Sequence, residues 1–150
     1  MEPIGPNFRP ISIEMSRKAM KNILSKMGKS ANGILDAIYR KDEDSATKAH
    51  EFLSTHGDIL LKFSVYWANV SYKHKPELKD RIDKIMKDFR DNIVGINNQV
   101  EKIIISIAHN DYVNTIYGRK DLSDIFEKTE ELIDELLQIG TDSGFGTRRS

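Results

Sequence analysis

Residues 78–108 read LKDRIDKIMKDFRDNIVGINNQVEKIIISIA, and their apolar side chains recur at intervals of three and four. This stripe consists of Leu78, Ile82, Ile85, Phe89, Ile93, Ile96, Val100, Ile103 and Ile107. The interval matches the turn of an α-helix that has one apolar face. It predicts a helix over about 77–108, with Pro76 in the first turn, where a missing N–H does no harm. Since the period passes unchanged through Gly95, we expect no break there.

The chain before this stretch has the same periodicity twice. One stripe predicts a helix over about 45–73, capped by Asp44 or Ser45, and the period passes through Gly57. The members of this stripe are Ala46, Ala49, Leu53, His56, Leu60, Phe63, Trp67 and Val70. The earlier stripe predicts a helix over about 13–39; its members are Met20, Leu24, Met27, Ala31, Ile34 and Ile38.

Capping and breaking signals refine the first of these helices. The Ser12 hydroxyl can accept from an early backbone N–H, so Ser12 is expected as the N-cap. Glycine is unfavourable inside helices, so the sequence leaves open whether this helix is kinked or broken near Gly28 to Gly33.

The chain after residue 108 predicts a short helical turn and then a fourth helix. Asp111 is expected to cap the turn YVNTIY, which Gly118 would close. The fourth helix would start after Asp121 and end at Ile139, with Gly140 in the position that commonly terminates a helix.

Three long helices and a shorter fourth, joined by brief turns, predict an all-α, up-down-up-down four-helix bundle. The expected organisation is an N-terminal arm over 1–11, the bundle over 12–140 and a flexible C-terminal tail over 141–150. A short fourth helix cannot cover the whole groove between its neighbours. The rest would either be closed by YVNTIYG and the N-terminal arm, or be the place where a second chain docks.

Composition excludes several classes of function. The 150 residues are 39% hydrophobic and 31% charged, which is typical of a globular domain. The absence of cysteine rules out disulfides, thiolate nucleophiles and cysteine-ligated metals. No apolar run approaches the length needed to span a bilayer, and the start MEPIGPNFRP lacks the features of a signal peptide, so a cytoplasmic protein is expected.

Charge is balanced overall but unevenly distributed. Residues 1–41 hold eight Lys/Arg against three Asp/Glu, and residues 121–150 hold eight Asp/Glu against three Lys/Arg. The first helix could therefore contact phosphates of a nucleic acid through Arg17, Lys18, Lys21, Lys26 and Lys29. The commoner arrangement is a solvated basic face that pairs with the acidic fourth helix beside it.

The favoured function is a non-enzymatic interaction or assembly protein. From Ile103 to Ala108 apolar side chains cover nearly the whole circumference of the helix, so this end is expected to be buried on more than one side. The expected partner is protein, first of all a second copy of the chain; the interface residues would be Ile104, Ile105, Ala108, Tyr112 and Tyr117. Abundant Ile, Lys, Asn and Asp would suit an AT-rich genome, such as that of a phage or mobile element, and a structural or adaptor role there.

The segment AHNDY contains His109 and is followed by a terminal amphipathic helix. This arrangement is similar to parts of the HEPN ribonucleases. That resemblance implies a helical bundle in which an Arg-x4-6-His motif acts on an RNA phosphate. The motif is degenerate here, because the residues five to seven before His109 are Lys102, Ile103 and Ile104. The alternative is that His109 interacts with the last carbonyls of its helix.

Metal and cofactor sites are not expected. Helical-bundle metal sites use Glu-x-x-His, and none of the four histidines has a glutamate three residues before it. His56, on the apolar stripe of its helix, is expected to be a core histidine with its hydrogen bonds satisfied.

Overall fold

The computed structural model describes residues 12–142, and these form an all-α protein with no strand in that range. The elements are α1 (Ile13–Tyr39), α2 (Glu43–His74), a 3₁₀ turn η1 (Pro76–Leu78), α3 (Lys79–Ala108) and α4 (Tyr112–Asp142). The predicted arm over 1–11 and all but the first two residues of the predicted tail over 141–150 lie outside this range. Those two residues continue α4, so the helix extends beyond the predicted limit of the bundle.

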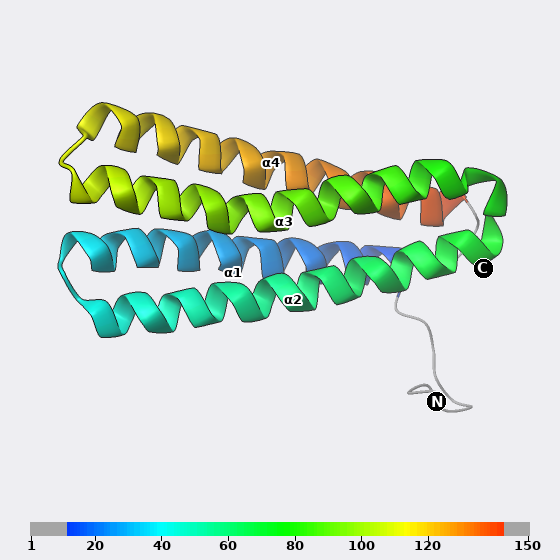
Figure 1. The fold of residues 1–150 in the computed structure, drawn as a ribbon. Helices are drawn as coiled ribbons and strands as arrows, with labels where there is room; N and C mark the ends of the chain where they lie inside the picture. Colours follow the sequence, from blue (N-terminus) through cyan, green and yellow to red (C-terminus); the bar gives the residue numbers. More distant parts are fainter. Residues whose placement is uncertain (1–11, 143–150) are drawn as a thin grey trace.

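The four helices form an up-down-up-down bundle, as predicted (Figure 1). The closest pairs are the hairpins α1–α2 and α3–α4, and α4 also packs against α1. The α1–α2 turn and the α3–α4 turn lie at the same end of the bundle, at the left in Figure 1, and η1 lies at the other end. Within the described residues no helix is both long and apolar enough to cross a membrane.

The prediction of a shorter fourth helix was wrong. α4 has 31 residues, against 27 in α1, 32 in α2 and 30 in α3. The segment expected as a separate turn is its first two turns, and Gly118 lies inside the helix. α4 therefore runs the length of the bundle, and its first turns occupy the length that a short fourth helix would not have reached.

Both glycines that were expected to end helical segments instead sit at close helix contacts. A Cβ on Gly118 would lie 2.7 Å from Cγ1 of Ile103 on α3. A Cβ on Gly140 would lie 3.1 Å from Cδ1 of Ile13 and 3.5 Å from Cε3 of Trp67. Gly140 does not terminate α4, because the helix continues to Asp142. Packing against neighbouring helices compensates for the poor helix propensity of glycine at these positions.

Two of the predicted N-cap residues are confirmed, although Asp111 caps the whole of α4 and not a separate short turn. Ser12 caps α1, because its Oγ accepts from the Met15 N–H at 3.1 Å. Asp111 caps α4 by accepting from the Asn114 N–H at 3.1 Å. The cap of α2 is Asp42 rather than Asp44 or Ser45; it accepts from both the backbone N–H and the hydroxyl of Ser45, at 3.1 and 2.7 Å.

Helix α1 is continuous through Gly28 and Gly33, so the helix does not break there. A Cβ on Gly28 would have no heavy atom within 4 Å, and one on Gly33 would meet only the Ala49 Cβ, at 3.8 Å. α2 likewise passes through Gly57, as predicted.

From Leu53 onward, the buried face of α2 agrees with the predicted stripe at every second position. At the positions between, the buried residue is the one that follows the predicted residue. Small residues seven apart, Gly57, Ser64 and Ser71, are buried beside Leu53, Leu60 and Trp67. His56 is therefore not a core histidine: it is partly exposed, stacks on the Phe52 ring, and its Nδ1 lies 3.0 Å from the Phe52 carbonyl oxygen. Hydrophobicity patterns overlook small residues, although such residues allow helices to approach closely.

The far end of the core is organised around Trp67. Its indole N–H donates to Oγ of Ser16 on α1 at 2.9 Å, and Gly140 of α4 lies against its ring. Trp67 is fully buried, so one side chain joins α2 to both α1 and α4. This end of the bundle lies opposite the α1–α2 and α3–α4 turns (Figure 1).

Candidate protein interface and basic face

A cluster of exposed apolar side chains lies where α3 ends and α4 begins. We call it the end patch, and its members with their exposed fractions are Ile105 (57%), Tyr112 (69%), Val113 (62%), Ile116 (67%) and Tyr117 (62%). Isolated exposed apolar residues are ordinary, but a local concentration of large ones is not. The end patch is thus the main candidate for a binding surface.

Most of the residues predicted for the interface lie in the end patch or beside it. Ile105, Tyr112 and Tyr117 belong to the end patch, and Ala108 is exposed beside it. Ile104 is different, because it is half-buried and packs against the core. Within residues 103–108, Ile103 is buried and Ile107 also packs against the core, whereas Ile105 and Ala108 are exposed on the outward side of α3.

Sequence reasoning missed Val113 and Ile116. Together with Tyr112 and Tyr117 they stand at positions i, i+1, i+4 and i+5 of α4, the spacing of one helix face. The signal was present in the sequence, but it was hidden when YVNTIY was interpreted as a short turn rather than the start of a long helix.

Two hollows border the end patch. A groove of about 330 Å³ lies between α3 and α4, where Ile105 and Tyr117 are joined by the polar residues Lys102, Asn114 and Asp121. Its floor includes Gly118, whose carbonyl accepts from the side-chain amide of Gln99 at 3.1 Å.

The second hollow, of about 440 Å³, lies between the two turns at the end of the bundle. Ile38, Tyr39 and Lys41 line it from the α1–α2 side, and Ile107, Ala108 and Tyr112 are among the residues that line it from the other. Each turn contains a residue in the left-handed region, Lys41 at φ 58° and Asn110 at φ 55°. The end patch is therefore bordered by two hollows: apolar side chains line most of the one between the turns, and apolar and polar side chains both line the one between α3 and α4.

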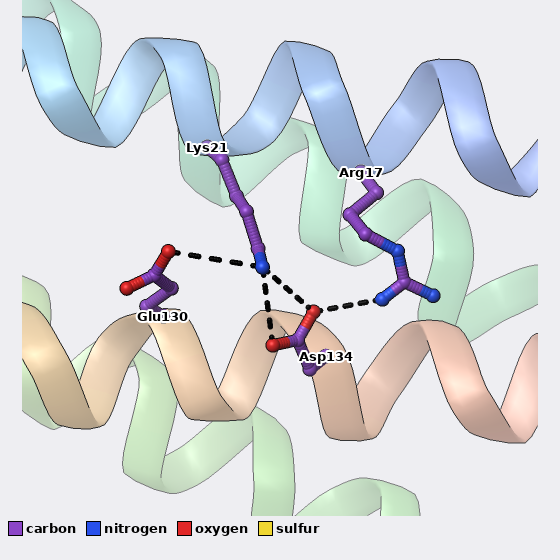
Figure 2. Close-up of polar contacts among 4 residues, drawn as sticks. All are labelled: Arg17, Lys21, Glu130 and Asp134. Carbon is purple, nitrogen blue, oxygen red and sulfur yellow. Dashed lines mark hydrogen bonds and ion pairs between the residues drawn. The ribbon is translucent and has the colours of Figure 1, made fainter.

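The basic face of α1 is partly occupied within the molecule (Figure 2). Arg17 Nη1 donates to Asp134 Oδ1 of α4 at 2.7 Å. Lys21 Nζ lies 3.1 Å from the same oxygen and 3.7 Å from Oε2 of Glu130. The prediction that the charges of the first and fourth helices pair within the molecule is confirmed for these two cations.

The other three predicted phosphate contacts face solvent. Lys18, Lys26 and Lys29 are exposed, and they form no ion pair with any carboxylate whose position the structure describes. At 1.5 Å per residue, Lys18 and Lys29 are about 16 Å apart along the helix. The available basic surface is therefore smaller than the sequence suggested.

His109 lies at the exposed C-terminal cap of α3. Its Nδ1 is 2.9 Å from the Ile105 carbonyl oxygen, to which it donates when the proton is on Nδ1. This confirms the predicted interaction with the last carbonyls of the helix. Among the described residues, no group of three or more acidic or histidine side chains is placed to share a metal ion.

A polar network at the η1 end was not anticipated from sequence. The Tyr72 hydroxyl of α2 donates to Oδ1 of Asp83 on α3, and Lys79 Nζ donates to Oδ2 of the same carboxylate at 2.7 Å. The hydrogen bonds from Lys79 and then Tyr72 hold the pKa of Asp83 below its usual range, and the bond to Asp83 raises the pKa of Tyr72. The network joins α2 to α3 beside their connection, which is a structural role.

Comparisons of the chain with protein-family models, with curated proteins and with solved structures give no significant match.

Proposed function

We propose that this protein is a non-enzymatic helical-bundle assembly protein that associates with a second copy of itself through the end patch. The observation that carries the proposal is the concentration of five large apolar side chains, each more than half exposed, on the adjoining ends of α3 and α4. The expected length difference between the helices no longer supports it, because α4 is as long as its neighbours.

The size of the end patch is suited to binding. From the areas that buried aromatic and aliphatic side chains usually remove from water, the exposed parts of these five residues amount to about 430 Å². That lies within the range of about 300–600 Å² found for the largest apolar patch on a soluble monomer, a patch that is often functional. Tyrosine is also enriched among the residues that contribute most to binding.

The test is light scattering coupled to size-exclusion chromatography on the wild type, Ile105→Asp and Val94→Asp. The wild type should elute with a mass above the 17.2 kDa of one chain. Ile105→Asp should be a monomer, because it places a charge in the interface. Val94→Asp is the matched control, since Val94 is 58% exposed on the same helix and lies outside the end patch.

A monomeric wild type over the accessible concentration range would refute self-association. The same mass for all three proteins, above that of a monomer, would place the interface elsewhere.

A second candidate function is nucleic-acid association through α1. The exposed Lys18, Lys26 and Lys29 favour it, because they are available to contact phosphates. Fluorescence anisotropy with single-stranded RNA and duplex DNA at low salt would detect such binding. Binding should fall as salt is raised and be weaker in a triple Lys→Glu variant at these positions; absence of binding at low salt would remove this candidate.

A further inference from the structure

The exposed side chains at the start of α4 form one continuous stripe along the helix. Tyr112, Val113, Ile116 and Tyr117 share its outward face, and Lys120 continues the stripe one turn further. From Tyr112 to Lys120 the stripe is about 12 Å long. Ile116 lies at its middle, and Ile105 of α3 flanks it across the groove beside Tyr117.

We propose that two copies pack through this stripe with their α4 helices antiparallel, about a two-fold axis that passes close to Ile116. The inference rests on the proposed function and adds the partner surface and its orientation. A two-fold interface is self-complementary, so one patch suffices for both copies.

The distribution of charge favours the antiparallel orientation. Antiparallel packing places Lys120 of each copy over the Tyr112 ring of the other, which is a favourable arrangement for a cation. Parallel packing in the same register would place Lys120 against Lys120. Within its own chain Lys120 is weakly held: its Nζ is 4.0 Å from Asp124 and its side chain is 74% exposed.

The end patch would supply the apolar centre of the interface. If the second copy covered it completely, the two patches together would bury about 860 Å² of apolar surface. Stable specific interfaces bury about 1,200–2,000 Å². The groove between α3 and α4 provides space beside Tyr117 for side chains of the second copy.

Disulfide trapping tests the geometry, since the chain has no cysteine of its own. Under mild oxidation Ile116→Cys should form a covalent dimer, because residues near a two-fold axis approach within the roughly 4.4–6.8 Å Cα separation that a disulfide requires. Val94→Cys is the control and should remain uncrosslinked. An equimolar mixture of Tyr112→Cys and Lys120→Cys, made distinguishable by a mass tag, should give mainly mixed dimers.

The outcomes separate this inference from the proposed function. If light scattering shows a wild-type monomer, the proposed function fails and the inference fails with it. The proposed function stands but the antiparallel geometry is wrong if the wild type is a dimer and either of two results follows. One is that the mixture of Tyr112→Cys and Lys120→Cys gives only dimers of a single variant. The other is that Val94→Cys crosslinks and Ile116→Cys does not.

A charge variant provides a second readout that needs no crosslink. Lys120→Glu should weaken dimerisation about fivefold or more, because it replaces the cation over the partner's Tyr112 ring with an anion. Lys128→Glu, exposed on the same helix beyond the stripe, should leave the dissociation constant unchanged. Equal effects of the two variants would overturn the orientation.

Discussion

At the residue scale, the contrast between glycines shows how far a local signal depends on its surroundings. Gly118 and Gly28 both lie inside helices, and the sequence marks both as weak points. Gly28 has open space around it, whereas Gly118 lies against the buried, β-branched Ile103. The same residue type is therefore replaceable at one position and required at the other.

We expect Gly118→Ala to destabilise the protein by about 1–3 kcal/mol, because the new methyl group would displace Ile103 from a well-packed site. Gly28→Ala, the matched control, should stabilise it by about 0.5–1 kcal/mol by reducing the freedom of the unfolded chain. Thermal unfolding followed by circular dichroism measures both. A stabilising Gly118→Ala would mean that α3 and α4 are further apart than described.

The cap of α2 predicts a dependence on pH. Hydrogen bonds from the side chain and backbone of Ser45 hold the pKa of Asp42 below its usual range. The folded state thus favours the ionised form, and this contribution to stability is present above the unfolded pKa of about 3.9 and is lost as pH falls through the lower folded value.

Asp42→Asn separates this contribution from the other carboxylates, because asparagine also caps helices but does not titrate. Wild type should be the more stable protein near neutral pH, and the difference in melting temperature should shrink as pH is lowered below about 4. A difference that stays constant from neutral to acidic pH would contradict the role of the Asp42 charge.

At the element scale, the ion pairs between α1 and α4 fix which surface of α1 remains free. Asp134 joins two cations of α1, and all three side chains are partly exposed. Exposed ion pairs contribute little, so the bundle depends mainly on its apolar core rather than on these contacts. Their larger consequence is that Arg17 and Lys21 are less available to an outside partner.

We predict that Asp134→Asn lowers the free energy of unfolding by about 1 kcal/mol or less, and that the loss decreases in high salt. Asp91→Asn is the control, because Asp91 has a single, more exposed partner in Lys87, and its effect should be smaller. Urea unfolding at low and high salt measures both. An effect of Asp134→Asn that is independent of salt would argue that the ion pairs do not form in solution.

At the scale of the whole molecule, the two ends of the bundle differ in character. The η1 end is joined by Trp67 and by the Tyr72 network, while the end with the two turns carries the end patch and its hollows. A protein that associates through one end should become more stable as its concentration rises, because only the folded chain has the assembled interface.

We therefore expect the melting temperature of the wild type to rise as protein concentration increases from about 1 to about 100 µM. Ile116→Asp should show no such rise, since it disrupts the end patch without touching the buried core. Scanning calorimetry across this range is the measurement. A wild-type melting temperature that is independent of concentration would argue against self-association.

The sequence by itself determined the all-α class, the limits of α1, the continuity of α2 through Gly57, the caps Ser12 and Asp111, and the pairing of the basic and acidic helices. These features follow from local properties: apolar periodicity, hydrogen bonding of a side chain to its own helix start, and net charge.

Only the tertiary structure decided the length of α4, the position of His56 and the exposure of Ile105. The reason is that each depends on what lies opposite. Gly118 and Gly140 continue a helix because Ile103, Ile13 and Trp67 pack against them, and Gly57 replaces His56 at the core because neighbouring helices approach there. Ile105 faces outward because four helices leave that side of α3 without a neighbour, and this openness makes the end patch available to a second chain.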